Sequence, residues 1–318
     1  MSEGRIDVHC HYLGGVVGQW FESTGYRATG GFRLPPWSPG AAVEFMDRWE
    51  ISTQVLSLPL SFGATPHEPG FAARFAREVN EAYATLMKEY PGRFGAFAAV
   101  PMDTADGALA EIEYALDTLG LDGVLLTSNA QGRYFGEPFH EPILAELARR
   151  KVPVFVHPED CPHAAELGFG RSSAVIEFPF DTARAVTNAI YRGVFRRYPN
   201  LTLILAHCGG VLPTLGWRIS ALSMLRGPQD ADIDSAHIAG VLRRLYYDTA
   251  LAGSRNSLQP TLSVTTPDHL LFGTDWPAAP EPVIVDNMDN IERFESLTGD
   301  QHTAINRSNA AALFTRFT

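Results

Sequence analysis

The 318-residue sequence predicts a single (β/α)₈ barrel, in which eight parallel strands are surrounded by helices. The first observation is that short apolar runs alternate with segments of helical periodicity, and eight such runs can be counted. The second is that these runs are continuously apolar, as expected for a parallel sheet buried on both faces. Eight such units in roughly 250 residues or more match this architecture in size.

An open doubly wound sheet is the alternative architecture. It is disfavoured because no Gly-x-Gly-x-x-Gly turn follows the first apolar run. The chain also contains no internal repeat, low-complexity tract or linker that would divide it. We therefore expect residues 1–318 to form one domain.

The strands are expected where short apolar segments are bounded by polar residues, glycine or proline. They are Arg5–His11, Gln54–Leu58, Phe94–Val100, Gly123–Leu126, Val152–His157, Leu201–Ala206, Leu245–Thr249 and Leu270–Gly273. Long irregular connections are expected after the first strand, at Tyr12–Pro39, and after the fifth, at Glu159–Glu177. Loops of that length in a compact domain commonly form a lid or a wall of the active site.

Helices are expected where apolar residues recur every three or four positions. The sequence predicts them at Ala41–Trp49, Phe71–Tyr90, Thr104–Leu119, Glu141–Arg150, Pro179–Tyr198, Val211–Arg226, Pro282–Leu297 and Asp300–Phe314. Ser38 is placed to cap the first of these helices, with Pro39 in its first turn.

Composition excludes several classes of function. The formal net charge is −11 and the chain has two lysines, which argues against binding to nucleic acid. No apolar stretch is long enough to cross a bilayer, and the first strand begins too early to leave room for a signal peptide. Cys10, Cys161 and Cys208 are odd in number and widely spaced, so we expect reduced thiols in a cytoplasmic protein.

The first strand carries a pattern typical of metal binding, because it reads Arg-Ile-Asp-Val-His-Cys-His. Strict alternation predicts two faces, one with Asp7, His9 and His11 and the other with Ile6, Val8 and Cys10. Two imidazoles on one face of a strand, two residues apart, can reach a single metal ion.

Three later strand ends also carry ligand-type residues, namely His157, His207 and Asp275. The strands of a barrel end at one rim, where barrel enzymes have their active sites. Imidazole nitrogen and carboxylate oxygen suit Zn²⁺ or a similar divalent ion, and a partly open ligand set suits catalysis. The sequence therefore predicts a catalytic metal centre at this rim.

Four motifs occur in a familiar order and spacing: Asp-Val-His-Cys-His at 7–11, Phe-Val-His-Pro at 155–158, Ala-His-Cys-Gly-Gly at 206–210 and Phe-Gly-Thr-Asp-Trp-Pro at 272–277. Together they resemble the amidohydrolase superfamily. More narrowly, they are similar to its 2-amino-3-carboxymuconate-6-semialdehyde decarboxylase branch, which includes γ-resorcylate and 6-methylsalicylate decarboxylases. The resemblance extends from Arg5 to Phe314.

The resemblance implies a particular metal centre. Its ligands would be His9, His11, His157 and Asp275, holding one divalent ion per chain, Zn²⁺ in the first place and Mn²⁺ in the second. Many members of the superfamily bind two metals through a carboxylated lysine on the fourth strand, but residues 121–128 contain no lysine. His207 would be a catalytic residue beside the metal.

The resemblance also implies arginines that hold a substrate carboxylate. Arg218 stands at the spacing after His207 where the branch places an arginine that enters the site of a neighbouring subunit. Arg33 roughly matches a second arginine in the first long loop. A homodimer is accordingly the expected assembly, and guanidinium groups suit bidentate carboxylate binding.

The function that follows is metal-dependent, non-oxidative decarboxylation of a small aromatic or unsaturated acid, resembling a hydroxybenzoate or a muconate. Either Asp275 or His207 would deliver a proton to the carbon that bears the carboxylate. A hydrolase of lactones or amides on the same barrel is the alternative. A binding or scaffold protein with a structural metal is a third possibility, for which His207 would be dispensable.

Overall fold

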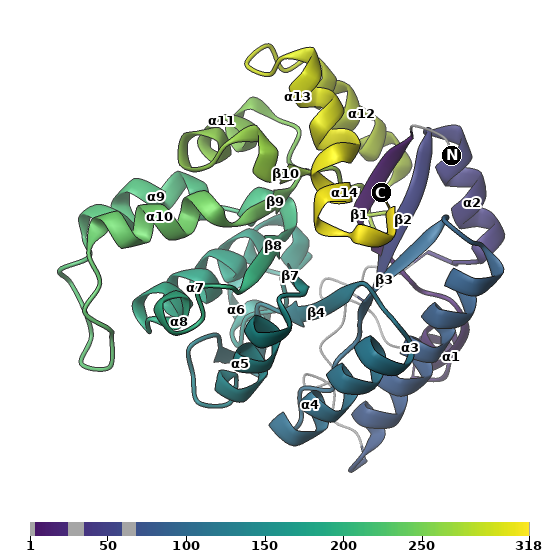
Figure 1. The fold of residues 1–318 in the computed structure, drawn as a ribbon, viewed down its shortest axis with the longest axis horizontal. Coiled ribbons are helices and arrows are strands. Elements are labelled where there is room, and N and C mark those ends of the chain that lie inside the picture. The colour runs from purple at the N-terminus through teal and green to yellow at the C-terminus, as the bar shows by residue number, and fades with distance from the viewer. Residues whose placement is uncertain (1–3, 25–34, 59–67, 318) are drawn as a thin grey trace.

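The computed structural model describes residues 4–24, 35–58 and 68–317. Eight parallel strands form one sheet in the order β1-β2-β3-β4-β7-β8-β9-β10, with helices around it (Figure 1). The sheet closes on itself because the Val8 N–H donates to the Phe272 carbonyl at 2.9 Å and the His11 N–H to the Trp276 carbonyl at 2.7 Å. The predicted (β/α)₈ barrel is confirmed.

All eight barrel strands lie at predicted positions, with ends that differ by a few residues. They are β1 Arg5–His11, β2 Ile51–Ser57, β3 Phe94–Ala98, β4 Gly123–Thr127, β7 Pro153–His157, β8 Thr202–Leu205, β9 Tyr246–Asp248 and β10 Leu270–Leu271. A small hairpin, β5 Asn129–Ala130 and β6 Arg133–Tyr134, follows β4 and was not expected from the sequence.

The described residues form fourteen α-helices, and several of these were not predicted from the sequence. They are α1 Gly15–Thr24, α2 Pro39–Arg48, α3 Phe71–Glu89, α4 Ala105–Glu113, α5 Glu141–Arg150, α6 Ala164–Leu167, α7 Glu177–Tyr191, α8 Val194–Arg197, α9 Leu212–Ala221, α10 Ser235–Arg244, α11 Arg255–Val264, α12 Glu281–Glu292, α13 Gly299–Thr303 and α14 Asn309–Leu313. The Ser38 hydroxyl accepts from the Ala41 N–H at 3.2 Å, as expected of a cap. Among the described residues, no helix is both long and apolar enough to cross a membrane.

Three of these differences correct the prediction. The connection after β1 is not wholly irregular, since it contains α1, and the connection after β7 contains α6. The single helix expected at Pro179–Tyr198 is two helices, α7 and α8, separated at Gly193, whose φ of 72° ends the first one. The helices α10 and α11 occupy a stretch where no helix was expected.

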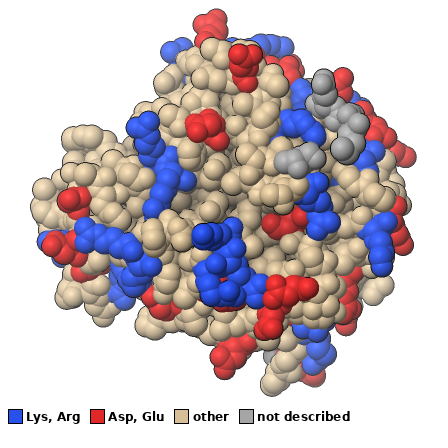
Figure 2. Space-filling view, viewed as in Figure 1, with Lys and Arg blue, Asp and Glu red and all other residues tan. Residues whose placement is uncertain are grey.

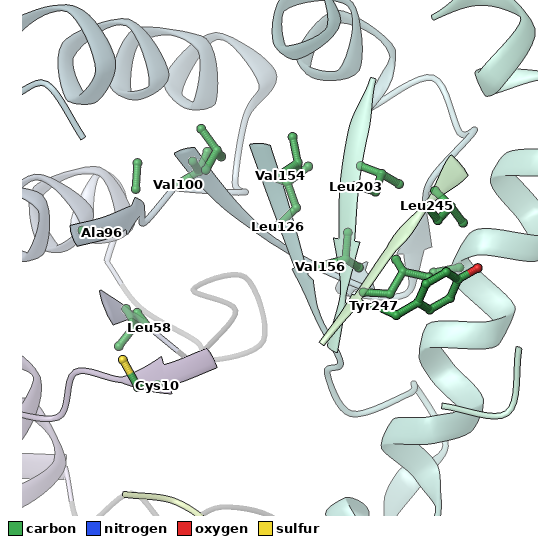
Figure 3. Close-up of a cluster of buried hydrophobic side chains, with 14 of the residues drawn as sticks. Cys10, Leu58, Ala96, Val100, Leu126, Val154, Val156, Leu203, Leu245 and Tyr247 are labelled. Carbon is green, nitrogen blue, oxygen red and sulfur yellow. The ribbon is translucent and has the colours of Figure 1, made fainter. Parts of the chain in front are cut away.

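The core has two layers. One lies between the strands and the surrounding helices, where Cys10, Val156 and Tyr247 pack from three different strands (Figure 3). The other fills the barrel itself, where Phe97 and Phe155 stack with centroids 5.1 Å apart. The segment around α14 covers one end of the barrel in Figure 1.

That end of the barrel is closed by aromatic side chains from the C-terminal segment. Phe314 is 2 % exposed and its ring centroid lies 5.7 Å from those of Phe97 and Phe317. Helix C-termini gather on this side, and α5 and α8 carry arginines in their last turns, where a cation complements the helix dipole. Figure 2 shows Lys and Arg side chains distributed over the same face.

A β-bulge in β1 breaks the alternation that the sequence predicted. Asp7 pairs with Gln54 and Cys10 with Leu56, so β1 has one residue more than β2 over this stretch. Ile6 and Val8 consequently pack inside the barrel, whereas Cys10 packs in the outer layer. The expectation that Ile6, Val8 and Cys10 share one face was therefore wrong.

The bulge also directs the Asp7 side chain away from the rings of the two histidines. Its carboxylate accepts hydrogen bonds from Gln54 Nε2 at 3.0 Å and from the Thr274 hydroxyl at 2.6 Å, and no arginine is among its hydrogen-bond partners in the described chain. Burial is the main cause that raises the pKa of Asp7 to about 6, while these hydrogen bonds oppose the shift. Asp7 thus ties β1 to β2 and to the segment after β10.

Candidate metal centre

Four of the predicted side chains meet at the rim formed by the C-terminal ends of the strands. His9 and His11 come from β1, His157 ends β7, and Asp275 follows β10. One ligand atom from each lies within 4.8 Å of all the others, and all four residues are buried. The ring centroids of the three histidines are 5.0–5.3 Å apart. The arrangement is thus compact enough for one ion.

Each of these imidazoles is held through Nδ1. His9 Nδ1 lies 2.7 Å from Asp248 Oδ2, and His157 Nδ1 lies 2.7 Å from the Pro158 carbonyl. His11 Nδ1 lies 3.0 Å from the Ser57 hydroxyl, which donates its own proton to the Cys10 carbonyl at 2.8 Å. Because each partner acts as an acceptor, the network assigns the proton to Nδ1 and leaves the Nε2 lone pair free. This is the tautomer that a metal-binding histidine needs.

The Nε2 atoms face a common point where a cation would be stabilised. His9 Nε2 is buried without a hydrogen-bond partner, and the Asp275 carboxylate lies 3.4 Å from it and 2.8 Å from His11 Nε2. A buried atom without a partner costs free energy, and a divalent ion would satisfy it. Three neutral nitrogens and one carboxylate oxygen therefore fit the predicted ion.

The protonation of the cluster shows the same preference for positive charge. Burial lowers the pKa of His9, but the neighbouring Asp248 and Asp275 carboxylates outweigh it and raise that pKa to about 10. Burial and the neighbouring histidines lower the pKa values of His11 and His157. Although burial disfavours its charge, the neighbouring His11 and His9 rings hold the pKa of Asp275 well below its usual range. The two carboxylates therefore favour positive charge at His9, and a metal ion would compete with a proton for its Nε2 atom.

His207 lies beside this cluster and outside its ligand set. It follows β8 in a left-handed conformation, with φ 55° and ψ 47°, and its Nδ1 donates to the Ala250 carbonyl at 2.9 Å. Its ring centroid is 4.8 Å from that of His9 and 6.1 Å from that of His157. His207 is only partly buried, so its Nε2 edge can face a substrate.

Strained backbone is concentrated at this rim. His207, Cys208, Leu251 and Asp275 have positive φ, between 51° and 64°, although none is glycine. They lie two to four residues after the ends of β8, β9 and β10. Such conformations cost on the order of 1–3 kcal/mol each and persist where surrounding contacts hold them, often in functional sites.

Of the two predicted arginines, the structure describes Arg218, which is not part of this cluster. Arg218 lies on α9 on the outer surface, in a groove that Phe180 and Arg184 also line. Arg33 lies outside the described residues. Neither assignment as a carboxylate-binding residue is tested by the arrangement within one chain.

Sequence reasoning missed two residues that orient the histidines, Asp248 and Ser57. Both stand at the last position of a buried strand, β9 and β2, where the polar residue points to the rim. The same signal that identified His157 was present at these positions. Asp248 was passed over because it belongs to none of the four motifs.

The chain belongs to the amidohydrolase family, since the family model described as amidohydrolase matches residues 6–316. Two curated relatives are decarboxylases. The decarboxylase yanB of Aspergillus niger is 33 % identical, over 98 % of this chain and 88 % of its own length. The 6-methylsalicylic acid decarboxylase of Penicillium expansum is 31 % identical, over 98 % of this chain and 96 % of its own length.

The barrel is also similar to a solved structure, that of a dihydroxybenzoic acid decarboxylase from Polaromonas sp. JS666 with bound manganese and the inhibitor 2-nitroresorcinol. The TM-score is 0.81 and the identity 24 %, over 98 % of this chain and 97 % of the other. At this identity the likeness shows a common fold.

Proposed function

We propose that residues 1–318 act as one metal-dependent barrel enzyme that decarboxylates a small hydroxybenzoate or related unsaturated acid without oxidation. The observation that carries this proposal is the set of three imidazole Nε2 atoms and one carboxylate that face one point at the barrel rim. Two relatives that match nearly the whole chain are named decarboxylases, and one of them is named for 6-methylsalicylic acid. That acid is the first candidate substrate.

In this proposal His9, His11, His157 and Asp275 hold one divalent ion per chain. The bound ion would supply a positive charge that attracts the anionic oxygen atoms of the substrate. Zn²⁺ is the expected metal from the donor set, and Mn²⁺ is tested beside it because the Polaromonas structure contains manganese. Phe155 forms part of the floor below the ligands, with its centroid 4.9 Å from that of His9.

We assign the proton transfer to His207 and not to Asp275. Asp275 is one of the four residues that would hold the ion, whereas His207 lies outside that set, uses Nδ1 for the Ala250 carbonyl and keeps Nε2 for the substrate. In this step His207 would act as an imidazolium that keeps its Nδ1 proton on the Ala250 carbonyl and gives its Nε2 proton to the ring carbon that bears the carboxylate. The bond to the carboxylate then breaks, its electron pair returns to the ring, and carbon dioxide leaves. His207 regains a proton from water.

We further propose a homodimer in which Arg218 faces the partner's site. Large apolar side chains are exposed on and near α6, α7 and α9, where a monomer would leave them in water. They are Leu167, Phe169, Val175, Ile176, Phe180, Trp217, Met224 and Leu225. Trp217, 81 % exposed, is adjacent to Arg218, so a second copy that covers Trp217 would bring the guanidinium to an interface. Light scattering should give a dimer for the native chain and a smaller species for Trp217→Glu.

A cytoplasmic location is also part of the proposal. It rests on the three cysteines, which are all buried and unpaired, as is usual where thiols stay reduced.

The test is to assay the purified protein with 6-methylsalicylate, 2,6-dihydroxybenzoate and muconate-like acids, and to measure its metal content. We expect about one divalent ion per chain, as a four-ligand site implies. With 6-methylsalicylate, equal amounts of carbon dioxide and 3-methylphenol should appear. A ring-opened acid from a lactone, without carbon dioxide from any acid, would identify a hydrolase instead. Two ions per chain, or none after gentle purification, would contradict the metal centre.

A further inference from the structure

Asp248, the last residue of β9, contacts two of the rim histidines, His9 and His207, through different oxygen atoms. Its Oδ2 lies 2.7 Å from His9 Nδ1. Its Oδ1 accepts the backbone N–H of His207 at 3.0 Å and that of Ala250 at 2.9 Å. Asp248 is completely buried, so its carboxylate has these protein groups as neighbours in place of solvent.

The Oδ2 contact determines which nitrogen of His9 carries a proton. An ionised carboxylate only accepts hydrogen bonds, so the His9 ring must donate from Nδ1. Nε2 then presents a lone pair to the point shared with His11 and Asp275. Partners of this kind in other metal sites typically change metal affinity about 10–100-fold when they are removed.

The Oδ1 contacts hold the loop that orients His207. One bond fixes the His207 N–H in a left-handed conformation, and the other fixes the Ala250 N–H. The Ala250 carbonyl in turn accepts from His207 Nδ1 at 2.9 Å. Asp248 therefore positions His207 in two ways: it holds the His207 backbone N–H directly, and it holds Ala250, whose carbonyl accepts from the ring Nδ1.

We propose that Asp248 is a positioning residue with two separable tasks: Oδ2 sets the metal-binding tautomer of His9, and Oδ1 holds His207 against the substrate. This inference rests on the proposed function, because it takes His9 as a metal ligand and His207 as the proton donor. A second cation between His9, His207 and Asp248 is a poorer interpretation of the same cluster. The atoms it would need are already used in hydrogen bonds to Nδ1 of His9 and to two backbone N–H groups.

The test is Asp248→Asn, a change of one atom. The two backbone N–H donors keep the amide oxygen at the position of Oδ1, so the amide nitrogen replaces Oδ2. That NH₂ group donates to His9 Nδ1 and forces the His9 proton onto Nε2, where it faces the metal position. Zinc affinity, measured by competition with a chromophoric chelator, should fall about 10–100-fold. At saturating zinc, kcat should fall clearly less than in Asp248→Ala, because the bonds to the His207 and Ala250 N–H groups remain.

Two further variants separate the tasks. Asp248→Ala removes both, so kcat at saturating zinc should fall in addition to the zinc affinity. Asp7→Asn is the matched control, since Asp7 is also a buried carboxylate beside His9 but accepts from the His9 backbone N–H at 3.1 Å and does not contact the ring. It should lose far less zinc affinity than Asp248→Asn. Circular dichroism and thermal unfolding verify that each variant is folded.

Native zinc affinity in Asp248→Asn would overturn the inference, as would a loss of kcat at saturating zinc equal to that of Asp248→Ala. Should the variants not fold, ¹⁵N-histidine NMR of the native zinc-loaded enzyme decides the tautomer. A His9 proton on Nδ1 supports the inference, and one on Nε2 overturns it. A native protein that binds neither zinc nor manganese would instead overturn the proposed function itself, and the inference with it.

Discussion

The two ends of the barrel are built from opposite kinds of residues. At the C-terminal rim, buried imidazoles and carboxylates converge, and four non-glycine residues have positive φ. At the other end, Phe97, Phe314 and Phe317 close the barrel with apolar contacts. The comparison teaches that stability and chemistry are separated along the barrel axis. Apolar packing at one end offsets the strain and the buried polar groups at the other.

The sharpest way to test this separation is to remove His207, the rim side chain to which we assign a chemical role and no structural one. His207→Ala should lower kcat by about 10²–10⁴-fold, the range expected for loss of a general acid. The zinc content should remain near one ion per chain, since His207 is outside the four-ligand set. Steady-state assays together with metal analysis would check both expectations. Activity that survives the substitution would favour a structural role for the metal.

The opposite result is expected when the apolar packing that closes the other end of the barrel is weakened. Phe314→Ala removes a ring that is 2 % exposed, and it should lower the free energy of unfolding by about 3–5 kcal/mol. Zinc content and kcat of the folded protein should be unchanged, because the ring lies at the far end of the barrel. Denaturant unfolding gives the first quantity. A loss of zinc without a loss of stability would show that the two ends are coupled. Phe314→Leu, which keeps most of the volume, serves as the control.

A smaller effect concerns pH. His140, at the start of α5, is buried between Phe135 and Phe139, with its ring centroid 5.2 Å from each of theirs. Burial, assisted by the charge of Arg133, lowers the pKa of His140 from 6.5 to about 4. The unfolded chain thus binds this proton more readily, so stability should fall as pH decreases from about 6.5 to about 4. The loss attributable to His140 should reach up to about 3 kcal/mol.

Chemical denaturation of the metal-free protein at several pH values would measure this effect. His140→Phe should be less sensitive to pH over this range than the native chain. The control is His163→Gln, which removes a histidine whose side chain is 71 % exposed. Equal pH dependence in His140→Phe and the native chain would show that His140 is not protonated on unfolding.

Much of the site could be predicted from the sequence because its ligand-type residues stand at or shortly after strand ends. A short apolar run identifies a strand locally, and the barrel brings all such ends to one rim. For that reason His9, His11, His157 and Asp275 could be placed together before their distances were known. A signal for α10 was also present and was missed: Asp234 caps it, accepting from the His237 N–H at 2.7 Å, before buried residues at helical spacing.

The sequence by itself determined the strands and the class of barrel, because both depend on local periodicity, and its four motifs pointed to the ligand-type residues through the resemblance that they carry. Only the tertiary structure decided that Ile6 and Val8 lie inside the barrel with the histidines, and that Asp248 reaches His9 across 239 positions in sequence. A bulge depends on the register of the neighbouring strand, and a hydrogen bond between distant strands depends on barrel closure. Neither is encoded in a local pattern, since both arise only when the strands meet.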